Sequence, residues 1–265
     1  WLGENPLKNK TILIHSEQGL GDTLQFCRYI NLFKNLSCTV LLEVERPLVT
    51  IMRSLLPEQN IFQKGAQLPE FDYHCPMMSL PLAFKTVGIA YLENGPYLKP
   101  SVSAMAHWSG VLGKSKKTRV GLAWRGNPNH VKNDMRSIKL KELIPMLSPR
   151  FEWISLEINP TDEEADLMQK CGYIRNFGSD IGDFLSTSAL CRNLQAVVTV
   201  DTSIAHLAGS IGAPVHLMLP YTPDFRWQHS GHTTDWYPNM VLHRQNQDRD
   251  WKPILRDINN SLLVD

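Results

Sequence analysis

Short apolar runs alternate with longer amphipathic segments along this chain, and the alternation predicts β-strands separated by α-helices. In the first part of the chain, strands are predicted at residues 11–15, 39–44, 60–62 and 71–74. Helices are predicted at residues 23–35 and 47–56. The strand runs are aliphatic and β-branched without strict polar alternation, which is typical of strands buried in a parallel sheet.

The same alternation begins again after residues 95–117, a stretch with several prolines and glycines and a lysine-rich end. This composition is typical of an interdomain linker. Strands are then predicted at residues 118–124, 152–156, 173–176, 196–200, 214–219 and 240–243. Helices are predicted at residues 139–147, 162–171, 182–191, 204–211 and 251–263.

This order of elements predicts an α/β protein with two parallel sheets, each covered by helices on both faces. One linker between two such sheets predicts two Rossmann-like domains. The carboxyl ends of the strands in the two sheets are expected to face each other. The cleft between those ends is the expected ligand site.

Composition and charge narrow the classes of partner. Lysine and arginine number 27 and aspartate and glutamate 26, for a net charge of +1, so no nucleic-acid partner is expected. No apolar run is long enough to span a bilayer and no signal-peptide pattern opens the chain. The five cysteines are scattered without a C-x-x-C pair, which favours reduced thiols, a cytoplasmic location and no zinc site. A start at Trp1 rather than Met predicts a piece of a longer protein.

The most informative segment is residues 201–206 (DTSIAH), which follows the buried strand predicted at 196–200. Asp201, Thr202 and Ser203 are residue types that cap a helix N-terminus. Such a start leaves backbone N–H groups and a positive dipole end in the cleft, where they bind phosphate. His206 lies about one turn further and is expected at the same mouth. The alternative is an ordinary helix cap with no ligand.

The first predicted strand also ends in a distinctive turn, Gly19-Leu20-Gly21-Asp22. The two glycines permit a tight turn and close approach of the backbone to a ligand. A dinucleotide fingerprint would need a third glycine where this chain has Leu24, so that interpretation is disfavoured. Asp22 is a carboxylate on the rim of the expected cleft, where it can act as a general base or as a helix cap.

The corresponding loop of the second half gathers cationic and amide groups. Arg125, Asn127, Arg136 and Ser137 are candidates to clamp a diphosphate, with Asn129 and Lys132 in the same loop. The alternative is a solvated charged loop.

Two further candidates stand at other strand ends. Arg226 belongs to the aromatic loop at residues 221–227, and His74 stands beside Cys75 at the end of a predicted strand. No metal-ligand constellation forms around His74. Gly19, Gly21, His74 and Arg226 are therefore assigned to the acceptor side or to shaping the loops.

Four motifs carry a resemblance to a known family: EQGLGD at 17–22, GLAWRG at 121–126, DTSIAH at 201–206 and PDFRW at 223–227. Together they resemble the glycosyltransferase domain attached to bacterial tetratricopeptide-repeat proteins. That domain is similar to the heptosyltransferases of glycosyltransferase family 9 and, more distantly, to O-linked N-acetylglucosamine transferase.

The resemblance implies the GT-B fold, two Rossmann-like domains facing across a cleft. It implies an acceptor-side domain at residues 1–112 and a nucleotide-sugar-binding domain at residues 117–247. A C-terminal helix at residues 248–265 is expected to pack back on the first domain.

The resemblance also implies roles for single residues. Asp22 matches the proposed general base, Thr202 and Ser203 match the donor-phosphate site, and Asp201 and His206 flank it. Two departures stand out: Ser203 replaces a glycine of the heptosyltransferases, and their donor-site lysine has no counterpart. Arg125 or Arg136 is the expected substitute.

The implied activity is that of an inverting, metal-independent glycosyltransferase with a nucleotide-sugar donor as substrate and no cofactor. Its acceptor is a hydroxyl, with a protein presented by upstream tetratricopeptide repeats as one candidate. Two alternatives stay open: a nucleotide-sugar epimerase of the same fold, and a catalytically inactive domain that binds a nucleotide-sugar or a protein.

Overall fold

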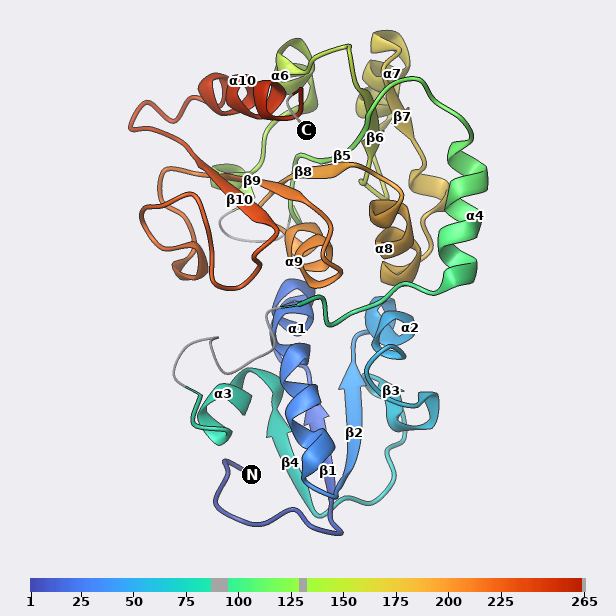
Figure 1. The fold of residues 1–265 in the computed structure, drawn as a ribbon, viewed down its shortest axis with the longest axis vertical. Helices are drawn as coiled ribbons and strands as arrows, with labels where there is room; N and C mark the ends of the chain where they lie inside the picture. The colour runs from blue at the N-terminus through green and yellow to red at the C-terminus, as the bar shows by residue number, and fades with distance from the viewer. Residues whose placement is uncertain (87–94, 129–132, 264–265) are drawn as a thin grey trace.

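The computed structural model describes residues 1–86, 95–128 and 133–263, and contains two α/β domains that meet end to end (Figure 1). The first domain holds a four-stranded parallel sheet in the order β3-β2-β1-β4. Its strands are β1 (Thr11–His15), β2 (Thr39–Val44), β3 (Ile61–Gln63) and β4 (Tyr73–Pro76). Its helices are α1 (Leu20–Phe26), α2 (Val49–Met52) and α3 (Leu80–Ala83), with 3-10 segments η1 (Cys27–Asn35), η2 (Arg46–Leu48), η3 (Glu58–Asn60) and η4 (Met77–Ser79).

The second domain holds a six-stranded parallel sheet in the order β10-β9-β8-β5-β6-β7. Its strands are β5 (Arg119–Ala123), β6 (Glu152–Ser155), β7 (Ile174–Asn176), β8 (Ala196–Val200), β9 (Val215–Leu219) and β10 (Met240–Arg244). Counted from β5, this is the 3-2-1-4-5-6 order of a Rossmann sheet, and the order reverses between β5 and β8. The two predicted parallel sheets are therefore confirmed.

The helices of the second domain cover both faces of this sheet. They are α4 (Val102–Leu112), α5 (Asn133–Arg136), α6 (Leu140–Leu143), α7 (Asp162–Cys171), α8 (Phe184–Arg192), α9 (Ser203–Ser210) and α10 (Lys252–Ser261). Short 3-10 segments are η5 (Ile144–Met146), η6 (Gly178–Asp180) and η7 (Phe225–Trp227). None of the helices over the described residues has the length and apolar character needed to cross a membrane.

Helix α1 begins three residues earlier than the pattern predicts, because Asp22 occupies its third position. There the carboxylate accepts a hydrogen bond from the backbone N–H of Gly19 at 2.9 Å, which closes the turn at the helix start. The predicted helix at residues 23–35 is thus α1 followed by the 3-10 segment η1. This start places Asp22 at the end of the helix that faces the second domain.

The predicted linker at residues 95–117 is wrong for most of its length. Ser101 caps helix α4 by accepting a hydrogen bond from Ala104 N–H. The Trp108 indole of α4 donates to Ser186 Oγ at 3.0 Å, and its ring lies edge-on to Phe177. Since both partners belong to the second domain, the first domain ends near residue 100 rather than at residue 112.

The expected packing of the C-terminal helix on the first domain is also wrong. The buried face of α10, with Ile254, Leu255 and Ile258, belongs to the core formed around β5 and β8. The amide of Asn259 donates to the Met146 carbonyl at 2.8 Å. Figure 1 shows α10 beside α6, at the end of the second domain remote from the first. An amphipathic helix packs on whichever apolar face is open, and here that face belongs to its own sheet.

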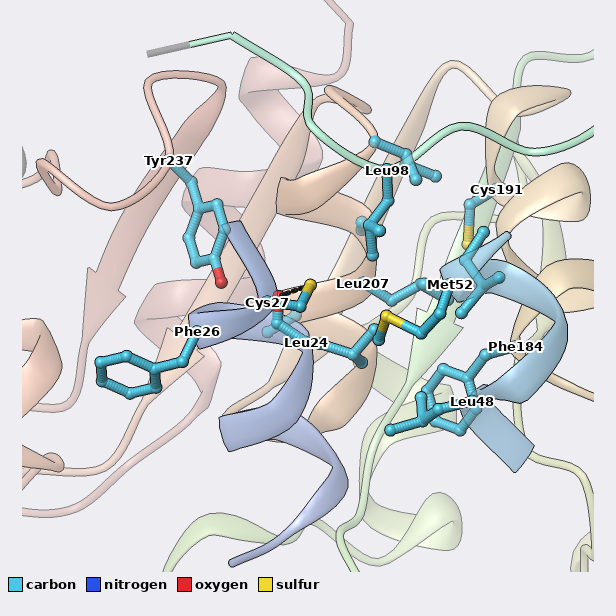
Figure 2. Packing of buried hydrophobic residues seen from close by; sticks show 14 of the residues in the cluster. Leu24, Phe26, Cys27, Leu48, Met52, Leu98, Phe184, Cys191, Leu207 and Tyr237 are labelled. Atoms are coloured by element: carbon cyan, nitrogen blue, oxygen red, sulfur yellow. Dashed lines mark hydrogen bonds between the residues drawn. The ribbon is translucent and has the colours of Figure 1, made fainter. Parts of the chain in front are cut away.

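The two domains share one hydrophobic core across their junction. Leu24 of α1 and Leu207 of α9 are both fully buried in it. Figure 2 shows these side chains converging, with Leu48 of the first domain beside Phe184 of α8. Thr50 also donates a hydrogen bond to Asp183 at 2.7 Å across the junction. The domains are therefore held in one arrangement by burial as well as by the connecting chain.

We expect Leu207→Ala to lower the free energy of unfolding by about 2–5 kcal/mol, because it opens a cavity in this shared core. Denaturant unfolding followed by circular dichroism measures the change. Leu82, which is 67% exposed in α3, provides the control: Leu82→Ala should stay within about 0.5 kcal/mol of the parent. Equal effects of the two substitutions would contradict this account of the junction.

Candidate functional site

A cavity of about 580 Å³ lies between the carboxyl ends of the two sheets. The turn after β1 contributes Gly19, Gly21 and Asp22 to its lining. The loop after β5 and helix α5 contribute Arg125, Asn127 and Arg136. The segment after β8 contributes Asp201, Thr202, Ser203 and His206, and the loop after β9 contributes Arg226. Most of the residues predicted from the sequence are thus brought together here.

Two predicted residues lie outside this cavity. Ser137 supports the loop after β5, because its hydroxyl accepts a hydrogen bond from Gly126 N–H and donates one to Asn133 Oδ1. His74 is exposed on β4, with its Nδ1 3.4 Å from Nε2 of His15. Asn129 and Lys132 lie outside the described residues.

The N-terminus of α9 forms the floor of the cavity at the point where the strand order of the second sheet reverses. Thr202 is the N-cap of this helix, and its hydroxyl accepts a hydrogen bond from Ile204 N–H at 3.3 Å. The Thr199 hydroxyl of β8 lies 3.5 Å from the same Thr202 hydroxyl. The cap fixes the first turn, so that the positive end of the helix dipole points into the cavity.

Arg136 lies against this helix start. Its Nη1 donates to the backbone carbonyl of Asp201 at 2.7 Å, while its buried Nε has no hydrogen-bond partner among the described residues. A side chain at Gly126 would come within 2.7 Å of the guanidinium, so the glycine makes room for it. Burial raises the pKa of the Asp201 carboxyl, and the Trp227 indole and the Arg136 charge oppose that effect. Arg136 therefore lines the cavity as a cation beside the positive end of the helix dipole.

Arg125 is held quite differently. Its guanidinium makes two hydrogen bonds of 3.2 Å to Glu164 and one of 2.8 Å to the Asn159 carbonyl. Glu157 lies 3.7 Å from its Nε. Glu164 also closes the capping box at the start of α7 through Thr161. The charge of Arg125 is thus already neutralised by a structural partner.

Glu157 is not among the site residues predicted from the sequence, yet it lines the same cavity just beyond the end of β6. Burial raises the pKa of its carboxyl to about 7, although the nearby Arg125 lowers it. The signal was present in the sequence, since Glu157 follows directly after an apolar strand run. An acidic residue at the end of the second strand of a Rossmann sheet is well placed to bind a ribose hydroxyl.

His206 is buried between the two helix starts. Its Nδ1 lies 2.9 Å from the Tyr237 hydroxyl, and its ring stacks on Trp227 at 5.4 Å. Burial lowers its pKa to about 3, with help from Arg226, Arg28 and Arg136. A side chain added at Gly21 would come within 2.8 Å of His206 Cδ2. The missing side chain of Gly21 thus lets α1 approach α9 closely.

Asp22 reaches the cavity from the first domain. One carboxylate oxygen accepts the Gly19 N–H, and the other forms an ion pair with the guanidinium of Arg226 in the second domain. The two side chains are 22% and 11% exposed, so this ion pair is largely shielded from water. Among the residues that the structure describes, no group of three or more histidine, cysteine, aspartate or glutamate side chains is placed to hold a metal ion.

We expect acidification to destabilise the fold through His206. Its pKa in the folded chain, about 3, lies below its ordinary value of 6.5. The stability from a neutral His206 is therefore complete above pH 6.5 and is lost as pH falls toward 3. Below pH 6, the unfolding free energy of His206→Gln should fall less steeply than that of the parent, by about 1 kcal/mol per pH unit.

The difference between the two proteins isolates His206 from other titrating groups, and denaturant unfolding at several pH values measures it. His229→Gln, at an exposed position, is the control and should retain the slope of the parent. Equal slopes for His206→Gln and the parent would contradict the assignment.

No protein-family model matches the chain. Protein FlbA of Caulobacter vibrioides is 23% identical over 287 residues; the match covers 99% of this chain and 48% of FlbA. The chain thus spans about half the length of that relative.

Solved structures align over nearly the whole chain. A glycosyl transferase family 9 protein from Veillonella parvula aligns with a TM-score of 0.65 and 8% identity, over 98% of this chain and 90% of its own. Heptosyltransferase WaaC of E. coli with ADP gives 0.60 and 10%, over 96% and 99%. The iron-containing heptosyltransferase TibC in complex with ADP-D-β-D-heptose gives 0.61 and 13%, over 98% and 78%. The chain has the fold of these proteins, GT-B, with two Rossmann-like domains facing across the cavity described above.

Proposed function

We propose that this chain is a glycosyltransferase that moves a sugar from a nucleotide-diphosphate donor to an acceptor hydroxyl. One observation carries the proposal. A single cavity places a carboxylate of the first domain, Asp22, opposite a capped helix start and an arginine of the second domain. A base on one side and a site for a departing diphosphate on the other are the two parts that such a transfer requires.

The donor is proposed to lie on the second domain. Its diphosphate would occupy the N-terminus of α9, at the backbone of Thr202 and Ser203, with Arg136 as the cationic clamp. Arg136 is preferred over Arg125 because Glu164 already pairs with Arg125. The Glu157 carboxyl would accept a ribose hydroxyl, and the apolar side chains of Leu156 and Phe184 would flank the nucleoside.

Asp22 is proposed to take the proton of the acceptor hydroxyl. The acceptor oxygen then forms a bond to the anomeric carbon as the bond from that carbon to the diphosphate oxygen breaks. One displacement of this kind inverts the anomeric configuration. The proton remains on Asp22, and the charge that develops on the diphosphate is met by the α9 dipole and Arg136 rather than by a metal ion.

The acceptor is proposed to be a protein hydroxyl, presented by tetratricopeptide repeats in the longer protein. The support is the sequence resemblance, together with the fact that FlbA extends well beyond the region matched here. Repeat modules bind extended polypeptides along their concave surfaces. The cytoplasmic location likewise stays a proposal.

A donor screen tests the proposed function. Thermal shift with ADP, GDP, UDP and CDP, in EDTA, should find one nucleoside diphosphate that stabilises the chain; the matching nucleotide-sugars then serve as donors. Release of the nucleoside diphosphate, together with a product whose anomeric configuration is inverted, as measured by NMR, would support the transfer. Conversion of the donor sugar without release would instead show an epimerase, and binding without turnover an inactive domain. Loss of binding in EDTA, restored by iron or Mg²⁺, would overturn metal independence.

We expect Asp22→Asn to lower kcat by about 10²–10⁴-fold, because the amide cannot accept the proton of the acceptor hydroxyl. The KM for the donor should stay near that of the parent, since the donor is proposed to lie on the other domain. Steady-state release of nucleoside diphosphate measures both constants. Full activity in this variant would remove Asp22 from the mechanism.

We expect opposite effects from substituting the two candidate arginines, Arg136 and Arg125. Arg136→Ala should weaken binding of the nucleoside diphosphate about 10–100-fold, the loss expected for a charge-assisted hydrogen bond. Arg125→Ala should weaken it much less and instead lower the melting temperature, because it leaves the partly buried Glu164 carboxylate without its cationic partner. Calorimetric titration of the two variants with one diphosphate gives the comparison. A larger binding loss for Arg125→Ala would reverse the assignment.

A further inference from the structure

Arg226 crosses the junction between the domains and contacts Asp22. It belongs to the 3-10 segment η7 of the second domain, and its Nη2 forms the ion pair with the Asp22 carboxylate of α1. The two residues are 204 positions apart in the sequence. Since the Arg226 side chain is only 11% exposed, the guanidinium has little freedom to move into solvent.

Other contacts hold Arg226 in place independently of Asp22. Its Nη1 donates to Asp224 Oδ1 at 2.9 Å, and its Nε donates to Gln25 Oε1 at 2.7 Å. Asp224 is itself fixed as the cap of η7, where it accepts the backbone N–H of Arg226. The guanidinium also lies over the Phe225 ring, with its central carbon 4.7 Å from the ring centroid. All three guanidinium nitrogens are therefore used, and the planar fork has one orientation.

Asp22, by contrast, is held at two points by the residues that the structure describes. Its Oδ2 accepts the Gly19 N–H at 2.9 Å, and its Oδ1 accepts from Arg226. A carboxylate can accept about four hydrogen bonds, so both oxygens keep capacity for an incoming hydroxyl. Arg226 therefore fixes one oxygen of Asp22 and the Gly19 N–H fixes the other, whereas Gln25 and Asp224 hold Arg226 without Asp22.

We propose that Arg226 is the positioning residue that aims Asp22 at the acceptor hydroxyl, supplied to the base from the opposite domain. This inference rests on the proposed function, in which Asp22 is the base. The base is thereby complete only when the loop after β9 is docked on α1. When Asp22 takes the proton and becomes neutral, Asp224 and Gln25 still hold the guanidinium, so the carboxyl returns to the same place after it releases the proton to solvent.

The test uses the donor from the screen above, with water as the acceptor, so that it needs no knowledge of the natural acceptor. Arg226→Gln should lower kcat for diphosphate release about 10–100-fold, while the KM for the donor stays within about twofold. Arg226→Lys should recover part of the loss. Guanidinium ion at millimolar concentration should raise the kcat of Arg226→Ala and leave the kcat of the parent unchanged.

A double-mutant cycle shows whether Arg226 acts through Asp22. The variant Asp22→Asn/Arg226→Gln should be no slower than Asp22→Asn alone, because a positioning residue has nothing left to position. If the kcat losses of the two single variants multiply in the double variant, the inference is overturned. A raised KM with unchanged kcat in Arg226→Gln would overturn it as well. If Asp22→Asn keeps full activity, the proposed function fails instead, whatever Arg226 does.

Arg244 supplies the matched control. Its guanidinium holds the same loop through the backbone carbonyls of Trp227, Gln228 and Gly231, and in the part of the chain that the structure describes it makes no hydrogen bond to Asp22. Arg244→Lys should loosen the loop and lower the melting temperature while leaving kcat within about threefold. A kcat loss equal to that of Arg226→Gln would show that loop order alone, and not the contact with Asp22, explains the effect.

Discussion

The packing of α1 against α9 is the constraint on which the rest of the structure depends. The two helices come from different domains, and each begins at the carboxyl end of its own sheet. Leu24 and Leu207 bury the contact, and the absence of a side chain at Gly21 lets His206 lie directly against the first turn of α1. Because both helix starts are fixed in this way, the Asp22 carboxylate on one and the capped N-terminus at Thr202 on the other face the same cavity.

The charges of the cavity follow from that packing. Three arginines line it, and each is held by different groups. Arg125 is paired with Glu164, Arg226 with Asp22 and Asp224, and Arg136 with a backbone carbonyl. A positive group next to a helix start is the one that remains able to attract an anion. In the proposed mechanism, Arg136 binds the diphosphate and Arg226 positions the base, while Arg125 is held by Glu164.

His206 lies at the same junction, and the groups in contact with it are neutral. A charged imidazole there would repel Arg226, Arg28 and Arg136, and burial already disfavours it. The Tyr237 hydroxyl and the Trp227 ring hold it as a neutral side chain instead. The junction can thus stay closely packed beside a strongly charged cavity. This combination explains why His206 can lie beside the helix start without carrying a charge.

The sequence by itself determined the local elements and most of the candidate site. The strands at residues 11–15, 39–44 and 196–200 and the cap at Thr202 follow from β-branched runs and capping residues, which act over a few positions. Tertiary structure alone decided that α4 and α10 pack on the second domain, since an apolar helix face fits any open apolar surface. It also paired Arg125 with Glu164 and joined Arg226 to Asp22. What an arginine can do depends on its ion-pair partner. Arg226 and Asp22 are 204 positions apart in the sequence, so only the folded chain shows that they meet.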